Sequence, residues 1–367
     1  MKDFLSKLTP SLGSNSVLRI VNQSSDMILA IFVVIIFMMI IIPIPPEGLD
    51  IFIAINITVS LSLLMVSMYI PKATNISSFP SILLITTLFR LGIEISATRQ
   101  ILLYANAGEI IYGFGNLVVG GNFVVGGVIF LIITIVQFIV VTKGAERVAE
   151  VAARFTLDAM PGKQMSIDAD MRSGMIDANQ ARELRLALAK ESQLYGAMDG
   201  AMKFVKGDVI AGIVIAVINI VGGLIIGVAI HGMTAMQAAK IYTLLSIGGG
   251  LVSQVPSLLV SLTAGIITTR VSSDKPDANL GSDISSQILS HPKALFLSSG
   301  VLFILSLIPV FPWFVFLPLS LLIGGTGIKK MLDEKKARGV VRSADGSSMS
   351  IEGKDDHALV KGGTTQF

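Results

Sequence analysis

The sequence has no cysteine, only three histidines and one tryptophan among its 367 residues. Without cysteine there can be no disulfide, no thiolate nucleophile and no sulfur-based metal site. The histidines at positions 231, 291 and 357 are too far apart to suggest a metal cluster. We therefore predict no metal site. We also predict no cofactor and no catalytic residues, and we expect that the protein is not an enzyme.

Charge is also scarce. Charged residues make up 14% of the chain, whereas about 25% is usual for soluble domains. Hydrophobic residues make up 52%, and the mean hydropathy is +0.76. A soluble protein of this size would need far more polar surface. The composition therefore predicts an all-α polytopic membrane protein. The small net charge of +3, with its basic residues in loops, does not indicate a nucleic-acid partner.

Long apolar stretches are present instead, and eight of them are long enough to be transmembrane helices. We place them at residues 27–46, 49–70, 80–103, 117–141, 209–230, 244–267, 294–310 and 312–328. The first lacks a small-residue cleavage site, so we expect no cleavable signal peptide. In the sixth, three glycines at 248–250 and Pro256 favour a broken helix.

The basic residues predict the orientation of these spans. Twenty-five of the 28 Lys and Arg residues fall on one side of the predicted membrane. By the positive-inside rule, both termini and the long polar segment between the fourth and fifth spans are cytoplasmic. The predicted organisation is an N-terminal segment, four spans, a charged subdomain, four spans and a cytoplasmic linker. Their ranges are 1–26, 27–142, 143–208, 209–330 and 331–367.

The charged segment at 143–208 has the signals of a folded helical subdomain. Residues 144–157 fit an amphipathic helix, which Pro161 and Gly162 are expected to end. A second helix is predicted at 178–193, with Asp177 as its N-cap and Gln180 completing a capping box.

Two ligand-binding patterns are incomplete in this segment. The carboxylates of Asp168, Asp170 and Asp177 suggest a calcium loop, but Ser173 stands where glycine is needed and no glutamate closes the loop. We interpret them as solvated or paired carboxylates. The segment at 161–164 lacks the glycine spacing of a phosphate-binding loop. Energy for any transport would therefore come from a membrane gradient or a partner.

Charged residues also occur within the predicted membrane spans. Arg90 and Glu94 are four apart in the third span and can pair on one helical face, and Arg99 lies about half a turn away. Two interpretations remain open. The charges can form an ion pair that holds the bundle together, or they can line an ion path.

Asp208 stands where the charged segment meets the fifth span. One interpretation is a carboxylate at a helix N-terminus, stabilised by the helix dipole and by nearby lysines. The other is a group that takes up and releases a proton at the membrane face. Lysines lower the pKa of a carboxylate and desolvation raises it, so the residues alone do not decide between them.

The charged segment carries specific motifs. Residues 147–155 read RVAEVAARF, residues 158–170 read DAMPGKQMSIDAD, and residues 84–91 in the third span read LITTLFRL. With the segment from Asp199 to Asp208, these motifs resemble the major export-gate membrane protein of type III secretion systems and bacterial flagella. The resemblance covers nearly all of residues 27–330. The sequence at 191–196, ESQLYG, is more similar to the virulence injectisome branch.

The resemblance implies a homo-oligomeric, nonameric ring in the bacterial inner membrane. Its implied partners are other inner-membrane export-apparatus proteins, the secretion ATPase complex, and exported proteins with their chaperones. It also implies that the proton motive force drives export of unfolded proteins. The family's main proton-coupling carboxylate corresponds to Asp208, and further functional charges correspond to Asp158, Asp199, Lys203 and Arg99.

The sequence departs from the family pattern in two places. Gly249 stands where the family usually has an aspartate, which would leave more proton handling to the charged segment. The family's large cytoplasmic docking domain, through which substrates and chaperones bind, is expected beyond the linker at 331–367 and is absent from this chain. Two alternative functions stay open: a membrane scaffold that anchors a docking ring without conducting protons, and a small-molecule transporter. A transporter would have an inverted repeat with paired broken helices, and only one candidate break is seen.

Overall fold

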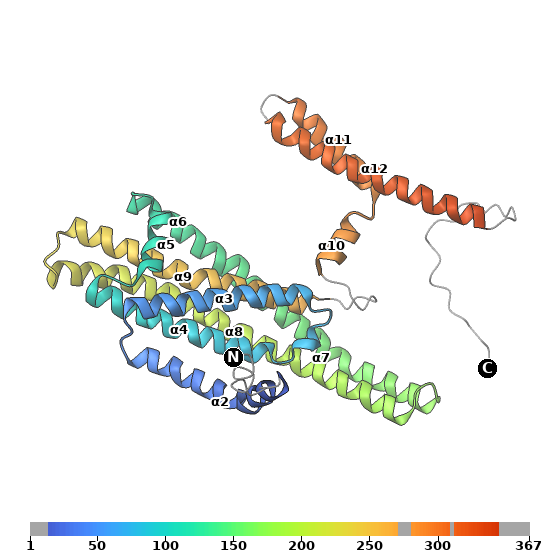
Figure 1. Cartoon of the computed structure of the whole chain (residues 1–367), viewed down its shortest axis with the longest axis horizontal. Coiled ribbons are helices and arrows are strands. Elements are labelled where there is room, and N and C mark those ends of the chain that lie inside the picture. The colour runs from blue at the N-terminus through green and yellow to red at the C-terminus, as the bar shows by residue number, and fades with distance from the viewer. Residues whose placement is uncertain (1–13, 271–279, 309–311, 345–367) are drawn as a thin grey trace, which may run out of the picture. The chain divides into compact units, whose positions relative to one another are not determined.

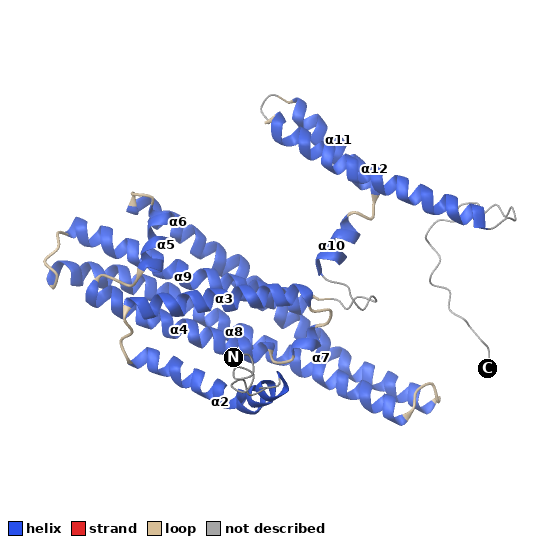
Figure 2. Ribbon diagram, in the orientation of Figure 1, coloured by secondary structure: helices blue, strands red, loops and turns tan. Residues whose placement is uncertain are grey.

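The computed structural model describes residues 14–270, 280–308 and 312–344, and all the regular elements in these ranges are helical (Figures 1 and 2). The chain divides into two compact units, Met1–Asn279 and Leu280–Phe367. The α-helices are α2 (Ser14–Ile41), α3 (Pro46–Tyr69), α4 (Phe79–Tyr104), α5 (Glu109–Val119), α6 (Phe123–Val136), α7 (Lys143–Arg172), α8 (Ala178–Ala229), α9 (Ala235–Thr269), α10 (Leu280–Ile288), α11 (Pro292–Leu307) and α12 (Trp313–Ala344). A short 3-10 helix, η1 (Ala73–Ile76), precedes α4, and a π-helical turn, η2 (Gln137–Thr142), joins α6 to α7.

The prediction of a polytopic helical membrane protein is confirmed, with fewer complete spans than the eight expected. In the described ranges, six helices are long and apolar enough to cross a membrane, and α10 with α11 makes a seventh if this bent pair is one span. The apolar part of α2, Met27–Ile41, is shorter than a full span. The predicted fourth span starts too early, because α5 ends at Val119 and the membrane-spanning helix begins with α6 at Phe123.

Helix α9 is the central helix of the first unit. It contacts α3, α4, α5, α6, α7 and α8, and more of its apolar window is buried than in most other spans. Figure 1 shows α3, α4, α6 and α8 running alongside it. The main apolar core lies in this bundle and includes the fully buried Tyr242 and Ile247 of α9. The central position of α9 makes its polar residues part of the bundle interior.

The predicted break in the sixth span is wrong, because α9 is continuous through its three glycines and Pro256. The glycines permit close helix packing instead. A Cβ atom at Gly248 would lie 2.0 Å from the carbonyl oxygen of Ile111 in α5, and one at Gly250 would lie 2.6 Å from the Phe130 ring in α6. Small residues at such contacts let helix backbones approach closely. The glycines therefore allow close helix packing and do not form a hinge.

Helices α7 and α8 form a long hairpin that extends past the end of the bundle (Figure 1). The predicted capping box is confirmed. The Asp177 carboxylate accepts a hydrogen bond from the backbone N–H of Gln180, and the Gln180 side-chain oxygen accepts one from the backbone N–H of Asp177. The predicted break at Pro161 is wrong, since α7 continues through it to Arg172. An interior proline costs a helix about 3 kcal/mol, which packing of α7 along α8 must offset.

Helix α8 is also longer than predicted, because it runs without interruption for 52 residues. It begins in the exposed hairpin and continues into the apolar bundle. Asp208 therefore lies in the middle of a helix, and the interpretation of this residue as an N-terminal carboxylate favoured by the helix dipole is wrong. The sequence contains a change of composition at this point, but the backbone contains no break.

A second apolar cluster joins the hairpin to the bundle. It contains Met198, Met202 and Val205 of α8, which pack with Phe79 and Leu83 at the start of α4. The end of α9 contributes further residues to the same cluster. This cluster lies next to Asp208 along α8 and makes the base of the hairpin part of the bundle's packing.

In the second unit, α11 and α12 pack as a hairpin. The hydroxyl groups of Ser299 and Ser320 each donate a hydrogen bond of 2.9 Å to the backbone carbonyl of the other residue. Helix α12 continues to Ala344, into the segment predicted to be a linker, and residues 345–367 lie outside the described part.

Candidate functional site

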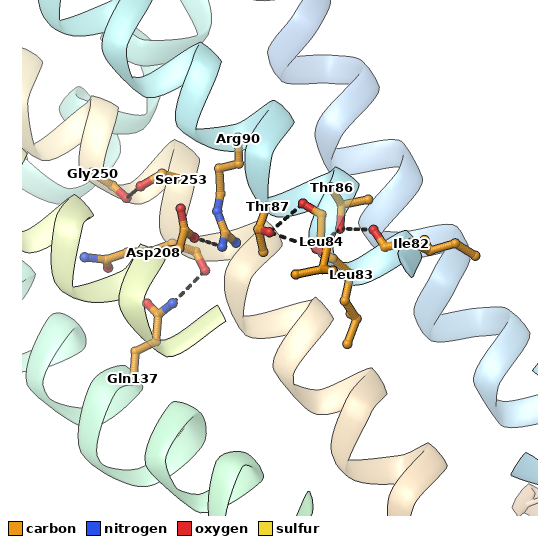
Figure 3. A network of polar contacts seen from close by, with 11 residues as sticks. Ile82, Leu83, Leu84, Thr86, Thr87, Arg90, Gln137, Asp208, Gly250 and Ser253 are labelled. Atoms are coloured by element: carbon orange, nitrogen blue, oxygen red, sulfur yellow. Dashed lines mark hydrogen bonds and ion pairs between the residues drawn. The ribbon is translucent and has the colours of Figure 1, made fainter. Parts of the chain in front are cut away.

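A buried ion pair joins α4 to α8. The guanidinium group of Arg90 contacts the carboxylate of Asp208, and their side chains are only 4% and 2% exposed. Figure 3 shows the two side chains pointing toward each other across the helix interface. Removing two charges from water is costly unless they are paired. Among the salt bridges of the described residues, this pair is the most completely buried.

The predicted pairing of Arg90 with Glu94 is wrong. The salt bridge of Arg90 is with Asp208, and no salt bridge of the described residues includes Glu94. Glu94 is nevertheless buried, with 8% of its surface exposed. Local spacing favoured the neighbour four residues away, but α8 brings a second carboxylate to the same arginine.

Arg99 has a different environment, in agreement with its predicted position about half a turn around α4. It donates hydrogen bonds to the carbonyl oxygens of Ile40 and Ile41, at 2.9 and 3.0 Å. The last four carbonyls of a helix have no partner within the helix, so Arg99 caps the C-terminal end of α2. Ser96 on the same face of α4 donates to the carbonyl of Met39 at 2.6 Å. Arg90 and Glu94 therefore belong to the buried charge cluster, whereas Arg99 caps a helix.

Helices α4 and α8 pack side by side and run in the same direction. After the Arg90–Asp208 pair, Glu94 faces Gly212, where an added Cβ atom would lie 3.0 Å from the carboxylate oxygen Oε1. One turn further along, the amide of Asn219 donates a hydrogen bond of 3.1 Å to Thr98. Polar or small residues thus recur at this interface every three to four positions, which is the spacing of one helical face.

A small polar cavity lies beside the ion pair. It offers about 10 Å³ to the centre of a water molecule, which is roughly the room that one water needs. Arg90, Glu94 and Asp208 are its titratable lining residues, and α9 contributes Gln254 and Ser257. Asp208 Oδ1, Gln254 Oε1 and the Ser257 hydroxyl are buried and have no hydrogen-bond partner among the described residues. Buried polar groups usually have such partners, so this cavity fits an ordered water.

The π-helical turn η2 forms part of the wall of this cavity. Gln137 in this turn, which Figure 3 labels, donates a hydrogen bond to a backbone carbonyl; the acceptor is Gln254 of α9, at 2.9 Å. Gln254 in turn donates to the Thr134 hydroxyl at 2.7 Å. Single π turns within helices are frequent at functional sites. This one turns a glutamine toward α9 just before the chain enters the hairpin.

A second cavity lies further along the same interface, again with about 10 Å³ for the centre of a water molecule. Glu94 lines it too, with Asn219 of α8 and with Ser246 and Gly249 of α9. Asn219 Oδ1 and the Ser246 hydroxyl are buried and have no hydrogen-bond partner. Glu94 is therefore the carboxylate that the two cavities share.

The other predicted site residues lie in the hairpin, away from this interior. Lys203 donates a hydrogen bond of 2.8 Å to Asp199 on the surface of α8. This bond and the charge of Asp199 raise the pKa of Lys203, which stays protonated at physiological pH. Asp158 is exposed on α7 and forms no salt bridge with a described residue. Asp199 is nine residues before Asp208, or about 13 Å along the helix.

The structure thus brings Asp208 together with Arg90 and Glu94, but not with Asp158, Asp199 or Lys203. The Arg90–Asp208 contact and the polar residues of α9 do not follow from the sequence patterns. A usable signal was present in the sequence, because an arginine inside an apolar span needs a carboxylate and Asp208 borders another apolar span. What was lacking was the register of the two helices.

The fold and the site together define a class, a polytopic α-helical membrane protein with a buried charge cluster at the base of a charged hairpin. The sequence profile of the FHIPEP family matches residues 35–360. The chain belongs to the FHIPEP family, which confirms the family resemblance drawn from the motifs at 147–170.

Several relatives are similar over most of this chain. Low calcium response locus protein D of Yersinia pestis is 54% identical over 333 residues, which are 91% of this chain and 47% of that protein. Harpin secretion protein HrpI of Erwinia amylovora is 56% identical over 308 residues, 83% of this chain and 43% of that protein. Protein MxiA of Shigella flexneri is 50% identical over 321 residues, 88% of this chain and 46% of that protein. The chain spans about half the length of these relatives. No solved structure matched it.

Proposed function

We propose that this chain is a membrane component of a bacterial type III protein-secretion apparatus of the injectisome branch. In this proposal it lies in the inner membrane and couples the proton motive force to the export of unfolded proteins. Membership of the FHIPEP family supports the proposal, as do relatives named for secretion, such as the harpin secretion protein of Erwinia amylovora. The proposed role is transport and needs no enzymatic reaction.

The observation that carries the proton-coupling part is the position of Asp208. It is a carboxylate buried in the bundle, on a continuous helix whose other half forms the exposed hairpin. Intramembrane carboxylates that face a bundle interior are typical of proton relays. A polar cavity large enough for one water gives Asp208 Oδ1 a neighbour through which a proton can arrive.

Protonation of Asp208 would change the force between α4 and α8. With the carboxylate neutral, Arg90 no longer has a counter-charge on α8, and the two helices lose the attraction of the Arg90–Asp208 ion pair. The apolar cluster of Met198, Met202 and Val205 lies directly before Asp208 on α8. A shift of α8 at Asp208 would therefore move the base of the hairpin, so that proton uptake acts on the cytoplasmic face.

Replacing Asp208 by asparagine tests this function. The amide keeps the shape of the side chain but cannot be protonated and released. We expect secretion to fall at least about tenfold, because removing a positioned proton-transfer group from an enzyme costs about 10²- to 10⁴-fold. The protein's membrane level and its assembly with other apparatus components should persist. Normal secretion from this variant would remove Asp208 from the mechanism.

The same experiment distinguishes proton coupling from the alternative function, a passive scaffold that anchors a docking ring. A scaffold needs only assembly, so an Asp208→Asn protein that assembles would secrete normally and would respond to an uncoupler as the native protein does. The homo-oligomeric ring, its nonameric stoichiometry and its contacts with apparatus proteins, the secretion ATPase complex, substrates and chaperones belong to the proposal. Crosslinking of the native and variant proteins in membranes reports on these partners.

A further inference from the structure

Glu94 lines both of the interior cavities. Its carboxylate lines the cavity of Arg90 and Asp208 and also the cavity of Asn219 and Ser246. Each cavity offers room for about one water. Each also contains buried oxygen atoms without hydrogen-bond partners, Asp208 Oδ1 in the first and Asn219 Oδ1 in the second. Both cavities lie along the interface of α4 and α8 with α9, and Glu94 lines each of them.

The charges around these cavities do not balance if both carboxylates are ionised. Arg90 is the one basic residue that lines the two cavities, whereas Asp208 and Glu94 are both acidic. An arginine side chain remains protonated in proteins. A bundle interior disfavours net charge, so the neutral arrangement has one carboxylate ionised and the other carrying a proton.

Arg90 is placed to serve either carboxylate. It contacts Asp208 across the helix interface, and Glu94 lies one turn along its own helix on the same face. No salt bridge of the described residues holds Glu94. Side chains four residues apart on a helix have Cβ atoms about 5–6 Å apart, so a rotation of the arginine side chain can exchange one partner for the other.

We propose that Asp208 and Glu94 share a single transferable proton, and that Arg90 pairs with whichever of the two is ionised. In the forward step, protonated Asp208 gives its proton through the cavity to the Glu94 carboxylate. Asp208 becomes the carboxylate and Glu94 the neutral acid, and no other bond changes. The inference rests on the proposed proton-coupled function and adds Glu94 to it as the second proton carrier.

The first test is secretion by Glu94→Gln, with Glu94→Asp as the variant that keeps a titratable group. We expect Glu94→Gln to lower secretion at least about tenfold at a normal membrane level. Glu94→Asp should retain most of the activity and should remain sensitive to an uncoupler. Normal secretion by Glu94→Gln would overturn the inference.

A relocated carboxylate gives a sharper test. Gly249 lines the second cavity, and a Cβ atom there would meet only the Ile101 side chain, at an ordinary contact distance of 3.5 Å. In the Glu94→Gln background, Gly249→Asp should restore secretion and Gly249→Asn should not. Aspartate and asparagine side chains have nearly the same shape, but only aspartate can take up and release a proton. Rescue by both, or by neither, would show that the role of Glu94 is not proton transfer.

The outcomes also distinguish this inference from the proposed function. If Asp208→Asn abolishes secretion while Glu94→Gln leaves it normal, the proposed function stands and the shared proton is rejected. If Asp208→Asn secretes normally, the proposed function itself is rejected, whatever Glu94→Gln does. Loss of secretion in both, with rescue by Gly249→Asp alone, supports both proposals.

Discussion

The charges of the bundle interior and those of the α7–α8 hairpin differ in burial, and therefore in how much the loss of one charge should affect stability and secretion. The hairpin's ion pairs are partly or largely exposed, and water screens them: Arg147–Glu150, Lys163–Glu191, Asp168–Arg185 and Asp199–Lys203. The Arg90–Asp208 pair is almost fully buried. A dense run of charge in a sequence therefore does not mark the place where a single charge has the greatest effect. That place contains one arginine and two acidic residues.

Removing the buried arginine should give the largest difference in stability between the bundle interior and the hairpin. Arg90→Met leaves Asp208 without its counter-charge, and breaking a buried pair in this way typically costs about 3–5 kcal/mol of stability. We expect a clear fall in the unfolding free energy of the purified chain in detergent. Arg147→Met, at an exposed pair in the hairpin, is the matched control and should leave that free energy nearly unchanged.

The double variant Arg90→Met/Asp208→Asn refines this contrast. Because it removes both charges together, it should recover most of the stability that Arg90→Met loses. It should not recover secretion, since the proton-carrying group is gone. A double variant as unstable as the single one would mean that Arg90 stabilises the bundle through contacts other than Asp208.

A smaller effect is expected at the hairpin surface. Lys203→Glu replaces the partner of Asp199 by a second negative charge one turn away on α8. The side chain is exposed, so the thermal unfolding midpoint should hardly change, while secretion should fall by roughly a few-fold if these charges contact the apparatus. An unaffected Lys203→Glu strain would show that the hairpin charges serve solubility and folding only.

The smallest expected effect is at Gly212, which faces Glu94. An alanine there would place its Cβ atom 3.0 Å from Glu94 Oε1, so the carboxylate must shift by a few tenths of an ångström. We expect Gly212→Ala to reduce secretion by about twofold or less. Gly200→Ala, on the same helix in open space, is the control and should be silent. An equal effect of both changes would indicate altered helix propensity rather than displacement of Glu94.

Local signals in the sequence predicted much of the fold. The low charge and long apolar stretches predicted a helical membrane protein, and the capping box at Asp177 is present as expected. The motifs at 147–170 predicted the family. These features depend on neighbouring residues or on composition, so one sequence contains enough information to find them.

Features that depend on packing between distant helices were not predictable. Proline tends to end helices, but α7 continues past Pro161 because α8 packs against it. Two ion pairs also join the helices, Lys163 with Glu191 and Asp168 with Arg185. Similarly, the i,i+4 rule assigned Arg90 to Glu94, and only the register of α4 with α8 shows the pairing with Asp208. The sequence also led us to expect that proton handling would shift to the hairpin, whereas we now propose Glu94 for this role.

Infrared spectroscopy of the purified full chain in lipid tests the central claim most directly, because it detects the carbonyl band of a buried protonated carboxyl group. A proton shared between two carboxylates predicts one such band at neutral pH in the native protein. The band should disappear in Asp208→Asn and equally in Glu94→Gln, because Arg90 then pairs with the single carboxylate that is left and no proton is needed for neutrality. A band that survives either substitution, or no band in the native protein, would contradict the account.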